Sequence, residues 1–273
     1  MKIAYLGPAG SFSHHVAKTA FPHADWQDYQ TITEVMQAYE AQEVDFAVVP
    51  VENSIEGSVH ETFDYLFHQG ELQVVAELIH PIKQQLLGRI TDLPIERILS
   101  HPQALAQGRR YLEEHFPGVQ FEVTASTSYA ARRVAEETEH SWAAIAPEAA
   151  AEEYGLQVLA KDIQEMEENY TRFWLLGHSS PVFSFEKEEK KLSLALTLPD
   201  NLPGALYKGL SVFAWRGLDL TKIESRPLKT ALGEYYFIID VVDQESTLHY
   251  ALEELSSLGI SYKVLGNYQV YRV

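Results

Sequence analysis

The sequence predicts a two-lobed α/β module followed by a smaller α+β domain of ferredoxin-like topology. Short apolar strands alternate with amphipathic helices through about residue 160, which is the pattern of parallel α/β sheets. The segment 179–190 is polar and charged, which suits a linker. Residues 191–273 follow the order β-α-β-β-α-β of the ferredoxin-like sandwich.

Composition limits the classes of function. The chain has 273 residues, 46% of them hydrophobic, which is enough for about two folded domains. Its formal net charge of −18 argues against nucleic acid and anionic membranes as partners. It has no cysteine, and its 11 histidines show no metal-binding spacing, so we expect no metal site. No signal-peptide pattern or membrane-spanning apolar run is present in the sequence, so we expect a cytoplasmic protein.

The first expected element is a strand at Ile3–Leu6 that ends in a glycine-rich turn. Ser13 is a plausible N-cap for a helix over 14–20. A strand, a turn and a helix start can form an anion site, because free backbone N–H groups converge there. The same two glycines are also typical of a simple tight turn, and the dinucleotide-binding fingerprint is incomplete.

A second polar strand end follows the buried strand expected at Asp45–Pro50. Just before that strand, Thr31 and Glu34 have the spacing of a capping box for a helix. Residues 51–58 then lie at the carboxyl end of the strand, where open α/β sheets bind ligands. The polar side chains of this segment are equally suited to capping the helix that follows it.

Polar groups also follow the strands of the second lobe, which the chain is expected to enter between 72 and 87. Ser100 closes a strand, and Gln107 lies on the helix after it. His101 is a possible base, although a lone histidine beside proline is more often a structural hydrogen-bond partner. Further strands, at 121–123 and 142–146, also lead into helices. Strand ends of two lobes would face each other across a cleft.

The segment Asn169–Gly177 joins polar side chains to a buried strand. Thr171 offers a hydroxyl that can donate or accept a hydrogen bond. Arg172 offers a planar guanidinium that can bond both oxygens of a carboxylate. Taken alone, the same residues would also fit an ordinary strand with a surface cation, so the other motifs have to decide.

Four segments together resemble the prephenate dehydratases that carry a C-terminal ACT regulatory domain: Gly7–Ser13, Val49–Val59, Ser100–Gln107 and Asn169–Phe173. In the tail, Gly204–Leu206 and Leu220–Pro227 resemble the effector motifs of that family. The resemblance covers essentially the whole chain. It implies a periplasmic-binding-protein-like catalytic domain at 1–178, with lobe one at about 1–77 plus 161–178 and lobe two at about 78–160. A linker at 179–190 and an ACT domain at 191–273 would follow.

This family converts prephenate to phenylpyruvate in phenylalanine biosynthesis, releasing carbon dioxide and water without a cofactor. The resemblance implies that Thr171 donates toward the leaving hydroxyl, and that Arg172 and Ser100 anchor a carboxylate. Glu52 would orient donors or act as an acid. The catalytic residues implied are Thr171, Arg172, Glu52, Asn53, Ser54, Ser100 and Gln107, and the substrate-binding residues are Phe173, Gly10 and Ser11.

The resemblance also implies feedback regulation by L-phenylalanine and assembly as a homodimer or homotetramer through paired ACT domains. The effector-binding residues implied are Gly204, Ala205, Leu206, Glu224, Ser225, Arg226 and Pro227. The chain departs from the usual pattern at Gly209, at Asp219 and at the pair His14-His15. Two alternatives stay open. One is arogenate dehydratase, with the same chemistry on an aminated side chain, and the other is a non-catalytic amino-acid-binding sensor that resembles solute-binding proteins.

Overall fold

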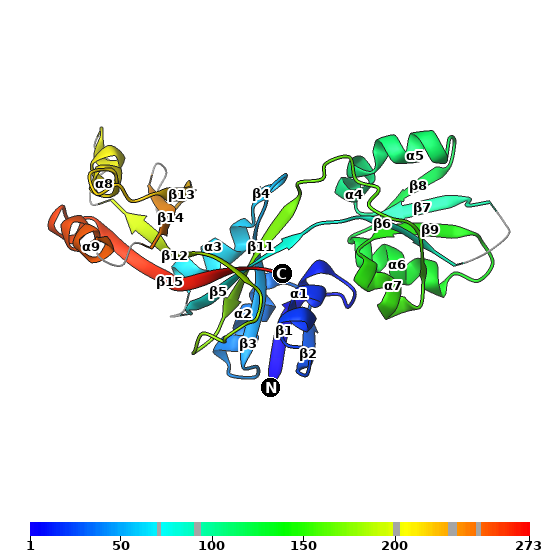
Figure 1. Cartoon of the computed structure of the whole chain (residues 1–273), viewed down its shortest axis with the longest axis horizontal. Coiled ribbons are helices and arrows are strands. Elements are labelled where there is room, and N and C mark those ends of the chain that lie inside the picture. The colour runs from blue at the N-terminus through cyan, green and yellow to red at the C-terminus, as the bar shows by residue number, and fades with distance from the viewer. Residues whose placement is uncertain (70–71, 90–93, 199–202, 229–233, 244–246) are drawn as a thin grey trace. The chain divides into compact units, whose positions relative to one another are not determined.

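The computed structural model describes residues 1–69, 72–89, 94–198, 203–228, 234–243 and 247–273. The chain divides into two compact units (Figure 1). The first unit contains 1–59, 79–173 and Val273, and the second contains 60–78 and 174–272. Among the helices of these residues, none has the length and apolar character needed to cross a membrane.

Lobe one of the first unit is built on parallel strands in the order β2-β1-β3. In this sheet Ile3 pairs with both Trp26 and Phe46. The helices α1 and α2 pack on it, and their buried residues Val16 and Val35 are fully covered. The elements are β1 (Lys2–Leu6), α1 (Phe12–Ala20), β2 (Asp25–Tyr29), α2 (Ile32–Glu40), β3 (Phe46–Asn53) and β4 (Gly57–Ser58).

The helix starts in this lobe follow the capping rules, with one correction. The predicted capping box at Thr31 and Glu34 is confirmed in both of its hydrogen bonds. The predicted N-cap at Ser13 is wrong, because α1 begins two residues earlier and Ser11 caps it. The Ser11 hydroxyl accepts a hydrogen bond from the His14 N–H at 3.2 Å. β2 was not predicted, since its sequence mixes charged residues with aromatic ones.

Lobe two is a three-layer α/β/α sandwich around a sheet in the order β10-β6-β9-β7-β8. Neighbouring strand residues point to opposite faces, so Leu86 packs with α4 and α5 while Leu87 packs with α6 and α7. The strands are β6 (Gln85–Gly88), β7 (Arg97–Ser100), β8 (Gln120–Val123), β9 (Trp142–Ala146) and β10 (Gln157–Ala160). The helices are α4 (Pro102–Gln107), α5 (Arg109–His115), α6 (Thr127–Glu136) and α7 (Glu148–Tyr154).

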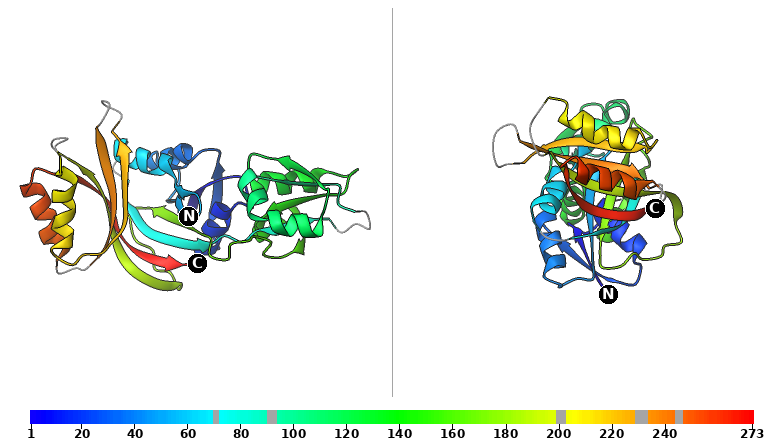
Figure 2. Two further views of the ribbon diagram at one scale, coloured as in Figure 1. Left: turned by 90° about the horizontal axis from the view of Figure 1, so that it is seen from above. Right: turned by 90° about the vertical axis from the view of Figure 1, so that its left-hand side faces the viewer.

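The second unit contains the predicted β-α-β-β-α-β domain, with antiparallel strands in the order β13-β14-β12-β15. Its two helices cover one face of the sheet (Figure 2), where Leu194, Phe213 and Leu255 are fully buried. The elements are β12 (Glu186–Thr197), α8 (Ala205–Ala214), β13 (Leu220–Pro227), β14 (Tyr235–Val242), α9 (Leu248–Ser257) and β15 (Ser261–Arg272). Two further strands, β5 (Val74–Pro81) and β11 (Tyr170–Leu176), each have residues in both units.

Two features of the second unit differ from the predicted boundaries. Residues 186–190, predicted as the end of a linker, belong to β12, and Glu186 pairs in register with Arg272. The helix α3 (His60–His68), predicted within lobe one, packs with the C-terminal strands instead. The Phe67 ring stacks on the Tyr236 ring with centroids 3.8 Å apart. Local charge patterning indicated a solvated segment, whereas strand pairing over a long distance in sequence decided the structure.

Candidate active site

A cavity of about 370 Å³ lies in the first unit and is lined by both of its lobes. Lobe one contributes the turn after β1, the start of α1 and the end of β3, and lobe two contributes α4 and the start of α6.

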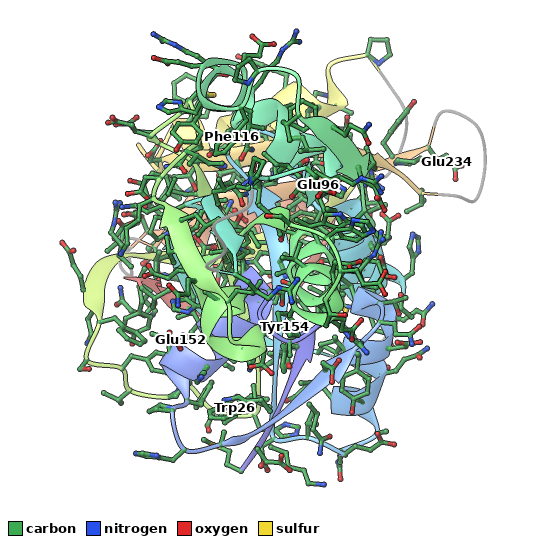
Figure 3. The ribbon with its side chains drawn as sticks, turned by 90° about the vertical axis from the view of Figure 1, so that its right-hand side faces the viewer. Trp26, Glu96, Phe116, Glu152, Tyr154 and Glu234 are labelled. Carbon is green, nitrogen blue, oxygen red and sulfur yellow. The ribbon has the colours of Figure 1, made fainter. Side chains whose placement is uncertain are left out.

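The lobes also meet directly, because the Tyr154 hydroxyl (labelled in Figure 3) donates to the Ala9 carbonyl at 2.7 Å. Gly10 has a φ of +76°, and a Cβ there would lie 3.0 Å from the Ala150 Cα. Glycine is therefore required by this close approach, and Gly10 is not among the lining residues.

The amide of Asn53 has its orientation fixed by the backbone. Its Oδ1 accepts from the N–H groups of Ile55 at 3.0 Å and Glu56 at 3.1 Å. Its Nδ2 is therefore the donor on the other side, where it lies 2.9 Å from Thr171 Oγ1 and 2.8 Å from Asn169 Oδ1. Asn53 thus connects the end of β3 to the start of β11.

This arrangement makes Thr171 and Asn169 donors toward the cavity. The Thr171 oxygen already accepts from Asn53, so its own proton is available for another acceptor. Thr171 is 9% exposed and lines the cavity. Asn169 turns its carbonyl oxygen toward Asn53 and Ser54, which directs its Nδ2 the other way.

Unpaired polar atoms converge on the same cavity. Among the described residues, four buried side-chain atoms have no hydrogen-bond partner, and all four belong to residues that line it. Buried polar groups in folded proteins are otherwise almost always paired. The atoms are Gln84 Oε1, Gln107 Oε1, Ser128 Oγ and Asn169 Nδ2. A polar ligand would supply the partners that the protein does not.

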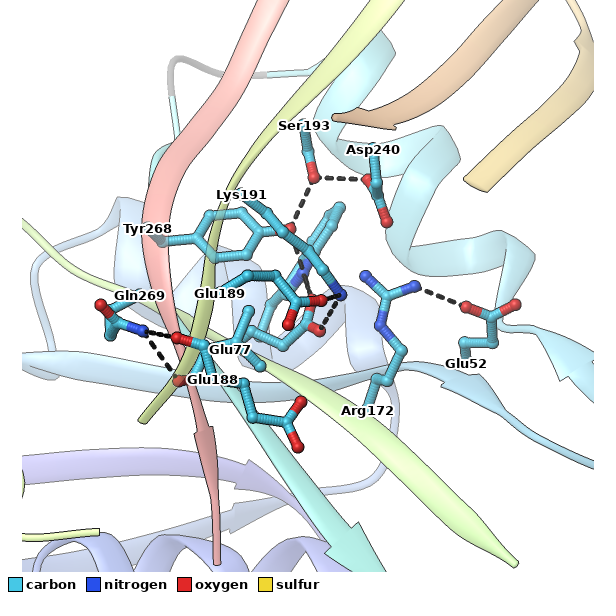
Figure 4. A network of polar contacts seen from close by, with 12 residues as sticks. Glu52, Glu77, Arg172, Glu188, Glu189, Lys191, Ser193, Asp240, Tyr268 and Gln269 are labelled. Carbon is cyan, nitrogen blue, oxygen red and sulfur yellow. Dashed lines mark hydrogen bonds and ion pairs between the residues drawn. The ribbon is translucent and has the colours of Figure 1, made fainter. Parts of the chain in front are cut away.

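Arg172 and Glu52, predicted as carboxylate anchor and as a possible acid, are not among the residues that line the cavity. Successive strand residues point to opposite faces, so Thr171 and Phe173 face the cavity while Arg172 faces away. The Arg172 guanidinium bonds Glu52 at 2.6 Å (Figure 4). The carboxylate that Arg172 meets is thus one of the chain's own.

Two other predicted site residues, Ser54 and Ser100, are not among the lining residues and bond backbone groups of neighbouring strands. The Ser54 hydroxyl accepts from the Tyr170 N–H at 3.0 Å and lies 3.3 Å from Asn169 Oδ1. Ser100 is fully buried and donates to the Ile145 carbonyl at 2.6 Å, and it is not among the lining residues. Its hydroxyl joins β7 to β9, and its predicted role as a carboxylate anchor stays a prediction. Ser11, in contrast, both caps α1 and borders the cavity.

His14 supports the glycine-rich turn as a neutral acceptor. Its Nδ1 accepts from the Gly10 N–H at 2.9 Å, and its ring stacks on Tyr5 with centroids 4.9 Å apart. Burial lowers the pKa of His14, which favours the neutral ring that this hydrogen bond needs. Among the described residues, no three His, Cys, Asp or Glu side chains gather in a way that could hold a metal ion.

The comparison with known proteins identifies the family. A family model described as "Prephenate dehydratase" matches residues 3–181. The chain belongs to the prephenate dehydratase family. It is 53% identical to the prephenate dehydratase of Lactococcus lactis subsp. lactis (strain IL1403), over 99% of this chain and 98% of that protein. It is 36% identical to "Arogenate dehydratase/prephenate dehydratase 2, chloroplastic" of Arabidopsis thaliana, over 99% of this chain and 73% of that protein.

A solved structure supports the same fold. The prephenate dehydratase of Arthrobacter aurescens, solved "in complex with L-Phe", has a TM-score of 0.86 and 33% identity over 98% of this chain and 89% of that one. The two-lobed module with a C-terminal ACT domain, predicted for this prephenate dehydratase sequence, is confirmed.

The predicted effector motifs of this prephenate dehydratase lie on α8 and β13. Gly204 caps α8 with a φ of +81°, a conformation that favours glycine. Glu224 lies 3.1 Å from the Lys222 ammonium and 3.3 Å from His60. Arg226 binds both carboxylate oxygens of Asp64 on α3, at 3.1 and 3.0 Å. These charges are paired within the second unit and are not free surface charges.

Of the four lining residues with unpaired buried atoms, three were missed at the sequence level, namely Gln84, Ser128 and Asn169. Asn169 lies within the recognised segment Asn169–Phe173, but Thr171, two residues later, was predicted as the donor because it carries a hydroxyl. Ser128 stands in the segment 124–128, which has a hydroxyl at every position but Ala125 and precedes a helix, and this is a usable signal. Gln84 stands in no sequence pattern that distinguishes it from the other glutamines of the chain.

Proposed function

We propose that this chain is the enzyme that converts prephenate to phenylpyruvate. The observation that carries the proposal is the convergence of four unpaired buried atoms and the Thr171 hydroxyl on one cavity. Prephenate has a ring hydroxyl and two carboxylates, so it offers both donor and acceptor partners to such a lining. Glutamine oxygens suit its hydroxyl, whereas the donors of Asn169 and Ser128 suit carboxylate oxygens.

The reaction removes one group from each end of the ring. The ring C–O bond breaks and the departing hydroxide takes a proton, while the bond to the ring carboxylate breaks and its electron pair enters the ring. The products are phenylpyruvate, water and carbon dioxide. Thr171 donates to the leaving oxygen, and since a threonine hydroxyl is a weak acid, it passes on its proton as it regains one from solvent, so that water leaves. Phe173, 1% exposed, gives the cavity an apolar wall.

An assay on two substrates tests this proposal. The purified chain is expected to form phenylpyruvate from prephenate, and the comparison substrate is arogenate, whose side chain carries an amine in place of the keto group. Phenylalanine formation from arogenate without phenylpyruvate formation from prephenate would reassign the enzyme to the aminated substrate. Binding of either compound without turnover would leave only a sensor.

L-phenylalanine is proposed as the effector, with the ACT domain as its site. Support comes from the Gly204–Leu206 and Glu224–Pro227 segments and from the Arthrobacter aurescens relative that was solved with L-Phe. Adding saturating L-phenylalanine is expected to change turnover or KM, and equal activity with and without it would refute this part alone. Assembly as a homodimer or homotetramer through ACT domains is part of the same proposal, and light scattering with and without L-phenylalanine measures it.

A further inference from the structure

We propose that the start of α6, with the Ser128 hydroxyl, binds the side-chain carboxylate of the substrate, the one that stays in the product. This inference rests on the proposed function. Ser128 is 0% exposed, its Oγ has no partner among the described residues, and it lines the cavity. Burying a hydroxyl without a partner is unfavourable, so its position is explained by a ligand that accepts its hydrogen bond.

The backbone of α6 adds donors at the same place. Ser126 caps this ten-residue helix, and its Oγ accepts from the Tyr129 N–H at 3.1 Å. The two preceding N–H groups, of Thr127 and Ser128, have no acceptor within a helix at these positions. The first turn contains no acidic residue, although the chain as a whole carries a net charge of −18. A helix start of this kind, next to a buried hydroxyl, favours an anion.

The start of α1 also borders the cavity but offers less to a ligand. The Ser11 hydroxyl donates to the Leu6 carbonyl at 3.0 Å and accepts from the His14 N–H. Its proton is therefore already used within the protein. Of these two helix starts, the one at α6 therefore has a side-chain hydroxyl whose proton is available to a ligand.

The chemistry of the two substrate carboxylates decides which one α6 holds. The ring carboxylate loses its charge as it leaves as carbon dioxide, so a strong anion site there would stabilise the ground state and slow the reaction. The side-chain carboxylate keeps its charge in the substrate, the transition state and the product. A charge-binding site contributes to affinity without opposing the reaction only if it holds this second group.

The proposal predicts a particular split between affinity and turnover. Because the carboxylate contact is the same before and after reaction, Ser128→Ala should raise the KM for prephenate and the Kd for phenylpyruvate together, by about tenfold or more, with kcat within about twofold. The methyl ester of phenylpyruvate lacks the charge, so its Kd should change much less in the same variant. A merely structural role for Ser128 would shift the two ligands alike.

The experiment measures prephenate kinetics of the full chain, and calorimetric binding of phenylpyruvate and its methyl ester. Ser256→Ala is the matched control: that hydroxyl bonds the Leu252 carbonyl on α9, outside the cavity lining, so its loss should leave every constant unchanged. If thermal melting shows that Ser128→Ala does not fold, Ser128→Cys, which keeps the shape of the side chain with a slightly larger and weakly donating group, decides the matter by the same measurements.

The outcomes are separable. An inactive wild-type chain would count against the proposed function. An active wild type, with phenylpyruvate bound equally well by the folded Ser128 variant, would overturn the α6 subsite alone. A loss of affinity confined to the charged ligand would support it.

Discussion

The two units of this protein bury polar side chains in opposite ways. In the first unit, atoms of Gln84, Gln107, Ser128 and Asn169 are buried around a cavity without partners. The second unit buries a comparable set and pairs it (Figure 4). Its fully buried Glu77 accepts from the Trp174 indole N–H at 3.0 Å and faces the Lys191 ammonium at 3.5 Å.

The same cluster continues through hydroxyl groups. The Ser193 hydroxyl lies 2.5 Å from the Asp240 carboxylate and 2.6 Å from the Tyr268 hydroxyl, and all three residues are 0–1% exposed. Paired groups of this kind hold strands in one arrangement. Unpaired groups cost folding energy and become useful only when a ligand arrives. Substitutions should therefore separate the two regions, affecting stability in one and activity in the other.

The largest effect is expected at Thr171. Thr171→Ala removes the cavity hydroxyl whose oxygen is held by Asn53, so kcat should fall by roughly 10²–10⁴-fold with a much smaller change in KM. Steady-state kinetics on prephenate measure both constants. Thr171→Ser, which keeps the hydroxyl, is the control and should retain far more turnover. A kcat for the alanine variant within about threefold of wild type would contradict the assignment of Thr171 as donor.

Glu77 tests the paired region. Glu77→Ala would leave the Lys191 ammonium with the partly exposed Glu189 carboxylate at 3.6 Å and would remove the acceptor of the Trp174 indole N–H, so the free energy of unfolding should fall by up to about 3–5 kcal/mol. Urea denaturation measures the loss. Glu77→Gln keeps an acceptor for the indole and should lose less. If Glu77→Ala were as stable as wild type, the paired cluster around Glu77 would not contribute to stability as predicted.

The sequence predicted the elements of the fold far better than the direction of individual side chains. Hydrophobic patterning predicted the β-α-β-β-α-β order of the C-terminal domain, and the capping rules placed the start of α2. Arg172 shows where this reasoning fails. Its motif was recognised, but side chains alternate along β11, so Arg172 points to the face opposite Thr171. Only the structure shows that Glu52 lies on that opposite face and bonds Arg172. The partner of Ser100 was likewise not predictable, because Ile145 lies on a strand distant in sequence.

Protonation of the buried His80 should make the stability of the fold depend on pH. Burial is the main cause that lowers the pKa of His80 from 6.5 to about 4, with a smaller contribution from His15, whose ring centroid is 4.9 Å away. The unfolded chain therefore binds this proton more tightly. The free energy of unfolding should have its full value above about pH 6.5 and fall by up to about 3 kcal/mol as the pH is lowered toward 4. Urea unfolding at several pH values measures the slope, which should flatten in His80→Asn. An unchanged slope in that variant would assign the acid sensitivity to other groups.

The smallest effect, and the sharpest contrast, is expected between Gln107 and Thr31. Gln107→Leu removes an oxygen that has no protein partner, so the free energy of unfolding should change by less than about 0.5 kcal/mol or rise, while kcat/KM falls by about tenfold. Thr31→Ala removes a paired cap of α2 outside the cavity lining, so it should lose about 1 kcal/mol of stability and no activity. Urea denaturation and prephenate kinetics on both variants give the comparison. Should Gln107→Leu instead destabilise the fold and leave kcat/KM intact, its oxygen would have a structural partner, and unpaired burial would no longer distinguish a binding site from a core.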